Sequence, residues 1–204
     1  MPRALLTVAS IALAAALGLL AWFSGPPAPP AALHQALDLA ATPTGGDFRL
    51  DSAAGTLDLA DLRGKVVLIY FGYTSCPDIC PTNLAMIAGA LRQLTPDELS
   101  QVQVLFISVD PERDDPERLA GYAPYFHPNI RGVTGTPEQI ATAARLYGAA
   151  YRRSAASESA MGYTVDHSAS TYLVDPQGRL ARTLDHATPS PAITAAIRAL
   201  LTRR

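Results

Sequence analysis

The two cysteines of this chain lie four positions apart, in the run Cys76-Pro77-Asp78-Ile79-Cys80-Pro81. They follow directly on the apolar stretch 66–71, and the chain has no other cysteine. In a fully extended chain their Cα atoms would be about 13 Å apart, so the thiols can meet only if the segment turns. A turn is favoured because each cysteine precedes a proline, and a residue before proline avoids helical backbone.

The second proline predicts the element that follows the cysteine pair. Pro81 suits the first position of a helix, where its missing N–H group costs nothing. The free N–H groups at such a helix end lower the pKa of a nearby thiol and favour the thiolate. Thiolate is the form that binds a metal or attacks a disulfide.

A strand–helix–strand unit is predicted to position this loop. Residues 66–71 and 102–109 are nearly unbroken apolar runs, which are typical of strands covered on both faces. Between them, apolar residues recur at helical spacing from Leu84 to Leu94. A right-handed crossover makes the two strands parallel. The cysteine loop then lies at the carboxyl end of the first strand, where ligands bind in open α/β sheets.

The remaining elements complete a mixed sheet flanked by helices. Alternation over 47–59 predicts an exposed hairpin, and a second hairpin pairs 171–174 with 180–184. Three further helices are predicted from local start signals. The first begins at Asp115 and should end or bend at Pro124. The second has a capping box at 136–139 and an apolar face from Ile140 to Tyr151. The third begins at Ser190. A polar loop is predicted over 154–160.

One histidine is predicted to lie at the same sheet edge as the thiols. If strand 171–174 runs antiparallel to strand 66–71, its start lies beside the cysteine loop. His167 immediately precedes that strand, so it can face both thiols although it lies 87 positions beyond Cys80. His34, His127 and His186 are predicted to be surface residues.

Two thiolates and an imidazole are soft to borderline donors that suit copper, which outranks zinc on most such sites. Three protein ligands leave a position for a partner's ligand, although some catalytic zinc sites have the same composition. A structural disulfide is the other common use of two cysteines in an exported domain. The loop position, the flanking prolines and His167 favour a functional pair.

Three motifs, Tyr70 to Pro81, Ile107 to Asp114 and Val165 to Ser168, resemble the SCO/SenC family in order and spacing. The resemblance covers about residues 48–184. It implies a thioredoxin-like fold and a membrane-anchored copper protein of the bacterial periplasm or mitochondrial inner membrane. It also implies copper ligands at Cys76, Cys80 and His167.

The same resemblance implies a task and partners. The family delivers copper to the dinuclear copper centre of cytochrome c oxidase, or keeps the cysteines of that centre reduced for loading. The implied partners are the oxidase subunit that holds this centre, together with another periplasmic copper carrier or a thiol reductase.

A thiol-disulfide oxidoreductase is the main alternative. Thioredoxin-like redox enzymes have two residues between their cysteines, whereas this chain has three. They also place a cis-proline where this chain has Asp166-His167-Ser168. A metal-capable side chain at that place favours metal binding. Peroxiredoxins use a Thr-x-x-Cys site, which Thr74 does not provide because it lies only two residues before Cys76.

Four charged residues have a functional and a structural interpretation each. Asp78, between the cysteines, can tune the metal or contact a partner, but aspartate is also a common turn residue. Asp110 and Arg113 belong to a motif that could shape a docking surface, or form a solvated loop before a helix. Asp166 could orient His167 by accepting from its other ring nitrogen, a role that a backbone carbonyl fills equally well.

The amino-terminal segment is predicted to be a membrane anchor. Residues 4–23 carry no charge, and about 20 such residues can cross a bilayer as a helix. We expect an anchor over 1–24, a Pro/Ala-rich linker over 25–37 and one domain over 38–204, with the domain in the periplasm beyond a bacterial inner membrane. A cleaved signal peptide is the alternative. The net charge of -2 argues against a nucleic-acid partner.

Overall fold

The computed structural model describes residues 42–154 and 162–202. Within them, the largest sheet has five strands in the order β5-β4-β3-β8-β9. β3 (Val66–Gly72), β4 (Val102–Ser108) and β5 (Ile130–Val133) run parallel. β8 (Thr171–Val174) runs antiparallel to β3, and β9 (Leu180–Leu184) runs antiparallel to β8. The predicted mixed sheet is confirmed.

The two central strands are buried because both faces of the sheet are covered. Every residue of β3 is buried, and in β4 only Gln103 is partly exposed. Burial on both faces explains why these strands are unbroken apolar runs and not alternating ones.

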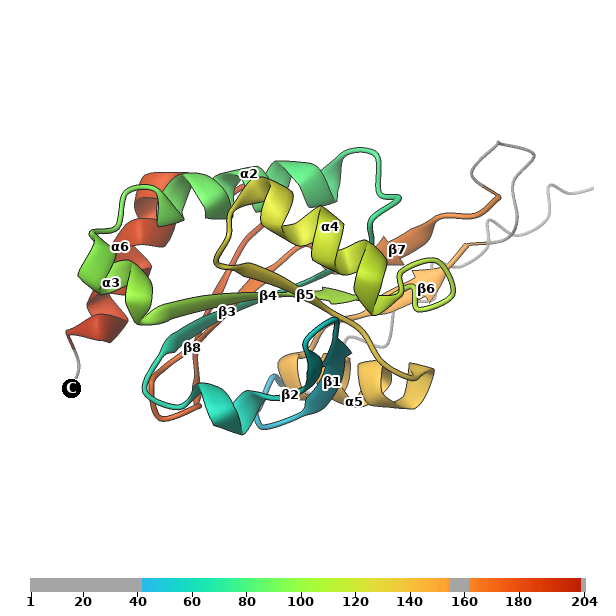
Figure 1. Ribbon diagram of the computed structural model, residues 1–204, viewed down its shortest axis with the longest axis horizontal. Coiled ribbons are helices and arrows are strands. Elements are labelled where there is room, and N and C mark those ends of the chain that lie inside the picture. Colours follow the sequence, from blue (N-terminus) through green and yellow to red (C-terminus); the bar gives the residue numbers. More distant parts are fainter. Residues whose placement is uncertain (1–41, 155–161, 203–204) are drawn as a thin grey trace, which may run out of the picture. The chain divides into compact units, whose positions relative to one another are not determined.

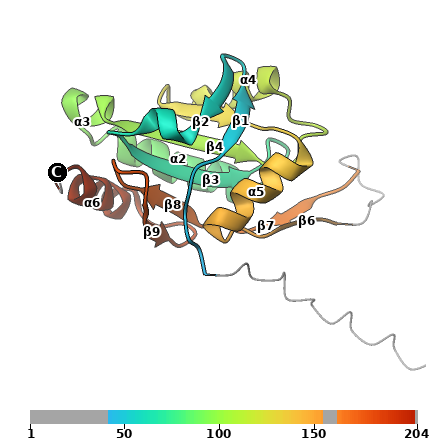
Figure 2. The same cartoon turned by 90° about the horizontal axis from the view of Figure 1, so that it is seen from below.

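Helices lie on both faces of the sheet. α2 (Ile79–Leu91), α4 (Pro116–Phe126) and α6 (Ser190–Leu201) lie on one face, whereas α5 (Pro137–Tyr147) lies on the other (Figure 1). Figure 2 shows α5 in front of the sheet when the molecule is seen from below. The β3–α2–β4 unit is therefore the predicted parallel crossover, and it brings the cysteine loop to the carboxyl end of β3.

The predicted amino-terminal hairpin forms, but it is not fully exposed. β1 (Arg49–Ser52) pairs antiparallel with β2 (Gly55–Asp58). Leu50 and Leu57 on this hairpin are buried. One face of the hairpin therefore contributes to the core.

One proline-based prediction is wrong, and one of the two alternatives in another is ruled out. α2 begins at Ile79, so Pro81 is its third residue and not its first. The whole first turn lacks intrahelical partners for its N–H groups, so proline is tolerated there as well. Pro124 does not end α4, which continues to Phe126. The helix ends where His127 adopts extended backbone before Pro128, as a residue preceding proline prefers.

α5 begins as predicted but ends earlier than its apolar pattern suggests. Thr136 and Gln139 form the expected capping box. Gly148 adopts left-handed backbone with φ of 64°, which ends the helix at Tyr147. Tyr151 therefore lies in a strand and not on the helix face.

Several short elements were not predicted. β6 (Tyr151–Arg153) and β7 (Val165–His167) form an antiparallel ribbon beside the sheet. β5, the 3-10 helix η1 (Leu59–Leu62) and α3 (Pro96–Ser100) are further examples. Elements of three to five residues are too short to show a hydrophobic period.

Part of the predicted organisation lies outside the described residues. This holds for the anchor over 1–24, for the linker over 25–37 and for most of the loop over 154–160. Among the helices that the structure describes, none is both long and apolar enough to cross a membrane.

Candidate metal centre

Three elements bring the soft donors together. Cys76 lies in the loop after β3 and is 8% exposed, and Cys80 lies in the first turn of α2 and is fully buried. His167 is the last residue of β7 and is partly buried. The antiparallel course of β8 beside β3 returns the chain to this edge, as the sequence predicts.

The geometry of the three side chains fits a small site. Their Sγ and ring nitrogen atoms all lie within 4.8 Å of one another. Sγ of Cys80 lies 3.2 Å from Nε2 of His167, and the N–H group of Cys80 donates to Sγ of Cys76 at 3.4 Å. Both cysteines are free thiols. The prediction that His167 faces the thiols is confirmed, and the group could hold a metal ion.

A backbone carbonyl fixes the orientation of the imidazole. Nδ1 of His167 lies 3.0 Å from the carbonyl oxygen of Ser168. A carbonyl oxygen only accepts, so Nδ1 carries the proton and Nε2 presents its lone pair towards Cys80. The rings of Tyr73 and Tyr70 meet the imidazole edge-to-face, at centroid distances of 5.8 and 6.2 Å. The imidazole is therefore held in the tautomer that can bind a metal through Nε2.

The two thiols differ in acidity. A hydrogen bond from the Cys80 thiol lowers the pKa of Cys76 well below its ordinary value, and bonds from the backbone N–H groups of Asp78 and Cys80 act in the same direction. The same pairing, together with burial, raises the pKa of Cys80. The mutual hydrogen bond thus separates the pKa values of the two thiols, with Cys76 the more acidic of the pair.

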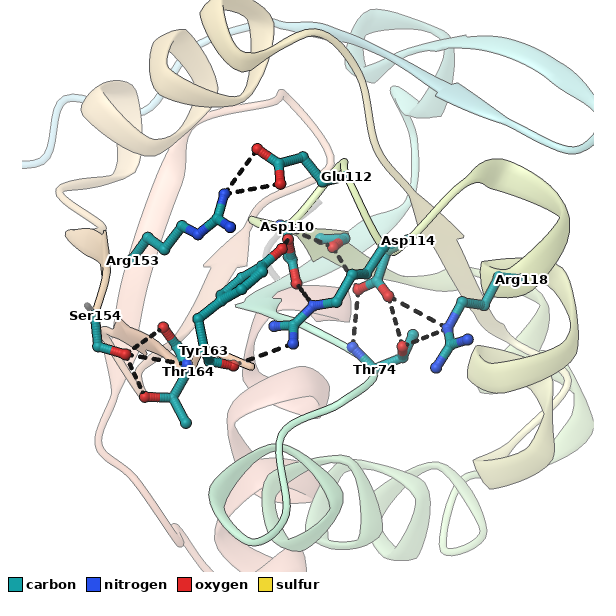
Figure 3. Close-up of polar contacts among 11 residues, drawn as sticks. Thr74, Asp110, Glu112, Asp114, Arg118, Arg153, Ser154, Tyr163 and Thr164 are labelled. Carbon is teal, nitrogen blue, oxygen red and sulfur yellow. Dashed lines mark hydrogen bonds and ion pairs between the residues drawn. The ribbon is translucent and has the colours of Figure 1, made fainter. Parts of the chain in front are cut away.

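A buried carboxylate anchors the cysteine loop to the neighbouring strand and helix. The Asp114 side chain is fully buried and accepts hydrogen bonds from the backbone N–H of Thr74 at 2.8 Å and from Ser108 at 2.6 Å (Figure 3). Arg118 of α4 pairs with Asp114 at 3.5 Å and donates to Oγ1 of Thr74 at 2.7 Å. These contacts fix the backbone two residues before Cys76.

Asp110 and Arg113 form a second cluster beside the centre. Asp110 is 4% exposed, accepts a hydrogen bond of 2.6 Å from the Tyr163 hydroxyl and forms an ion pair with Arg113 (Figure 3). The Arg113 guanidinium lies 3.7 Å from the centroid of the Tyr163 ring and 5.5 Å from that of Tyr73. Tyr73 in turn packs on His167. The cluster thus adjoins the imidazole through one ring.

The side chains of the other two charged candidates, Asp78 and Asp166, are exposed. Asp78 precedes α2, is exposed, and makes no hydrogen bond that caps the helix. Asp166 is exposed and pairs with Arg152 at 3.5 Å. Neighbouring residues of a strand face opposite sides, so Asp166 cannot share the face of His167. The Ser168 carbonyl, the alternative named from the sequence, orients the imidazole.

Several residues around the centre were missed from the sequence. Asn83 donates to the carbonyl of Ala169 at 2.6 Å and so holds the segment after His167. Its position three residues after Cys80, on the same helix face, is a signal that could have been used. Thr74, Asp114 and Tyr163 act through contacts across 40 and 53 positions, for which a single sequence gives no local signal.

The fold and the site together define a thioredoxin-like domain with a Cys-Cys-His cluster that suits a metal ion. The SCO1/SenC family model matches residues 38–202. The chain belongs to this family.

Individual relatives agree with this assignment. The human mitochondrial protein named SCO2 homolog is 45% identical over 135 residues, which cover 65% of this chain and 50% of that protein. The structure of yeast Sco1 with copper bound matches with a TM-score of 0.71 at 33% identity, covering 80% of this chain and 91% of that one. A structure of BsSco, described with a disulfide switch and as a member of the Sco family of cytochrome c oxidase assembly proteins, matches with a TM-score of 0.63 at 25% identity, covering 81% of this chain and 97% of that one.

The mammalian SCO2 homologs are longer than the matched region. The chain spans 50 to 58% of the length of the human, bovine and mouse proteins. The SCO1/SenC family model covers residues 38–202, which include the cysteine pair and His167.

Proposed function

We propose that this protein is a copper carrier that binds one copper ion through Cys76, Cys80 and His167. The observation that carries the proposal is the convergence of three soft donor atoms within 4.8 Å at one sheet edge. Two sulfurs and one imidazole nitrogen form a donor set that copper prefers. Copper bound to the related yeast Sco1 supports the same cargo here.

The number of ligands suits a protein that gives up its cargo. Three donors leave room for a ligand from the recipient, so copper can pass without being released into water. Cys76 is 8% exposed and the neighbouring Ile79 is 36% exposed, so the loop that carries the thiols is accessible from outside. A recipient can approach on this side.

The recipient in this proposal is the dinuclear copper centre of cytochrome c oxidase. The description of BsSco as an oxidase assembly protein supports it. We further propose that residues 1–24 anchor the chain in a bacterial inner membrane, and that 25–37 hold the domain in the periplasm close to the oxidase. The family match begins at residue 38, directly after this linker.

Copper titration of the purified, reduced chain tests the site. We expect one Cu(I) per chain. Changing an outer partner of a metal ligand typically costs 10–100-fold in affinity, so Cys76→Ala, Cys80→Ala and His167→Ala should each cost more than about 100-fold. His127→Ala is the control, because His127 lies at the end of α4 and is not part of the cluster. Wild-type affinity in all three ligand variants would disprove the assignment.

The redox state of the pair provides a second test. Oxidation of Cys76 and Cys80 to a disulfide should abolish Cu(I) binding, because the sulfurs lose the charge that binds the metal. Bound Cu(I) should in turn slow alkylation of both thiols by iodoacetamide. Equal alkylation rates with and without copper would contradict the proposal.

A thiol reductase is the second candidate function, and the unequal acidity of the thiols favours it. Cys76 as the more acidic thiol and Cys80 as the less acidic one match an attacking and a resolving cysteine. The disulfide switch of BsSco is consistent with such chemistry. In this function the protein would keep the cysteines of the oxidase copper centre reduced.

His167 separates the two functions, because a dithiol reductase needs both cysteines but no metal-binding imidazole. In the carrier, His167→Ala should leave a reducible cysteine pair yet fail to support oxidase assembly at limiting copper. Added copper should restore part of the oxidase activity. Normal assembly at low copper in His167→Ala cells, with failure in either cysteine variant, would instead favour the reductase.

A further inference from the structure

Tyr70 occupies an unusual position for a tyrosine. It lies in the middle of the central strand β3 and is fully buried. Within residues 42–154 and 162–202, its hydroxyl has no hydrogen-bond partner. A buried hydroxyl without a partner is costly, and such groups are rare enough to need an explanation. A phenylalanine would give the same apolar ring without that cost.

The hydroxyl lies on the same side of the sheet as the Cys80 sulfur. Residues two apart on a strand point to the same face, so Tyr70 shares its face with Gly72. A Cβ atom at Gly72 would lie 2.7 Å from Sγ of Cys80 and 2.7 Å from the ring of Phe106. Tyr70 stacks on that same Phe106 ring, with centroids 6.2 Å apart. The tyrosine, the sulfur and the His167 ring therefore share one buried space.

The other polar group near the hydroxyl is already occupied. Oδ1 of Asn83 accepts from Nδ1 of His186 at 3.1 Å and from the N–H of Ala187 at 3.0 Å. The Asn83 nitrogen donates to Ala169. Burial raises the pKa of the Tyr70 hydroxyl, and the Cys80 thiol is the next largest influence on it. The sulfur is therefore the acceptor that remains for this hydroxyl.

We propose that Tyr70 is a positioning residue of the metal centre, whose hydroxyl donates a hydrogen bond to Sγ of Cys80 when that sulfur binds metal as a thiolate. The inference rests on the metal-binding function proposed above. A neutral thiol is a weak acceptor, whereas a thiolate accepts strongly. The hydroxyl thus finds its strongest acceptor when the sulfur binds metal.

A hydrogen bond to a metal-bound sulfur has a measurable electronic effect. It withdraws electron density from the sulfur and so raises the energy of the thiolate-to-metal charge-transfer transition. It also fixes the direction of the sulfur lone pairs, as outer partners of metal ligands do. Co(II) is a suitable probe, because it gives such a band and does not oxidise thiols.

The test compares Tyr70→Phe with wild type in the full chain, loaded with Co(II) or Cu(I). We expect the charge-transfer band to move to longer wavelength and Cu(I) affinity to fall about 10-fold. Without metal, the Tm should stay the same or rise, because the variant removes only an unpartnered oxygen. Tyr147→Phe is the matched control, since the buried Tyr147 hydroxyl donates to the carbonyl of Gly46 at 3.1 Å. It should lower the Tm and leave the band unchanged.

An unchanged band and affinity in Tyr70→Phe would overturn the inference while the copper carrier stands. A wild-type chain that binds neither metal would overturn the proposed function, and the inference with it. If Tyr70→Phe does not fold, wild type loaded with spin-half cadmium gives a readout without a variant. A hydroxyl proton bonded to the metal-bound sulfur should couple to the cadmium nucleus, and absence of that coupling would overturn the inference.

Discussion

The two ends of the parallel strands use polar side chains in different ways. At the amino end, Arg198 pairs with Glu98 at 2.8 Å and donates to the carbonyl of Gln93 at 2.9 Å. Asn129 donates to the carbonyls of Leu99 and Val102. These side chains are partly or fully exposed, so water can replace each contact.

At the carboxyl end, several polar groups are buried. The side chains of Asp114, Tyr70 and Cys80 have no exposed surface, and Asp110 is 4% exposed. Water cannot replace a lost partner there, so each contact has a larger effect on stability and position. The comparison teaches that this fold concentrates its buried polarity at the edge where the candidate metal centre lies. The following predictions test that difference, from the largest expected effect to the smallest.

Removing the buried carboxylate should have the largest effect. Asp114→Ala leaves the N–H group of Thr74 and the hydroxyl of Ser108 without their acceptor. Losing hydrogen bonds to a buried charge should lower the free energy of unfolding by about 3 kcal/mol. Urea unfolding measures this change. Copper affinity should fall as well, because the loop before Cys76 loses its attachment.

Glu117→Ala is the control for Asp114→Ala. Glu117 lies in α4, three residues after Asp114 in the chain, and is exposed. Its removal should change stability by less than about 0.5 kcal/mol and leave copper binding intact. Equal destabilisation by the two variants would show that side-chain burial does not explain the larger effect expected at the carboxyl end of the strands.

Filling the space above Gly72 should have the next largest effect. In Gly72→Ala the new methyl group meets Sγ of Cys80 and the Phe106 ring, both at 2.7 Å, where no atom can stay in place. Overpacking of a buried site typically costs 1–3 kcal/mol, and we expect about 2. Because Cys80 must move, copper affinity should fall even in the fraction that folds. Isothermal titration of the folded variant measures it.

Gly121→Ala is the matched change at a site with space. Gly121 lies in α4, and a Cβ atom there has no neighbour within 4 Å. Alanine is favoured over glycine in a helix by up to about 1 kcal/mol, so this variant should be slightly more stable. If Gly72→Ala were also slightly more stable than wild type, the close approach of Cys80 to β3 would not restrict the position of the Cys80 sulfur.

The sequence predicts the central unit and the donors because their signals are local. The apolar runs of β3 and β4 and the apolar spacing in α2 follow directly from burial on both faces of the sheet. His167 was placed correctly because an antiparallel β8 can only start at the carboxyl end of β3. Topology thus connects Cys80 and His167 across 87 positions without any local pattern.

The surroundings of the site are less predictable. Tyr70 and Gly72 belong to an apolar run, so their types alone do not distinguish a core residue from one beside a sulfur. Asp110 and Tyr163 meet because the unpredicted β6–β7 ribbon brings residue 163 to the end of β4. Three-residue strands with polar side chains give no period, and their pairing is decided by tertiary contacts.

The amino end of the sheet should respond to pH with a small effect. The hydrogen bond from Arg198 lowers the pKa of Glu98 from 4.5 to about 2. A carboxylate with a depressed pKa in the folded state stabilises the protein above its unfolded pKa, and this contribution is lost as the pH falls through the folded value. Stabilisation by the pair should therefore be complete above about pH 5 and decline between pH 4.5 and 2.

Glu98→Gln isolates this charge, because glutamine can still accept from the N–H of Thr95 in the capping box at the start of α3. The variant should have a slightly lower Tm than wild type at pH 7, and this difference should shrink as the pH approaches 3. Added salt should also reduce the difference, because salt screens an ion pair that is in contact with water. Copper affinity should not change. A Tm loss as large as that of Asp114→Ala would mean that polar contacts at the exposed end of the sheet stabilise the protein as much as those at the buried end. The two ends would then differ in their chemistry but not in their contribution to stability.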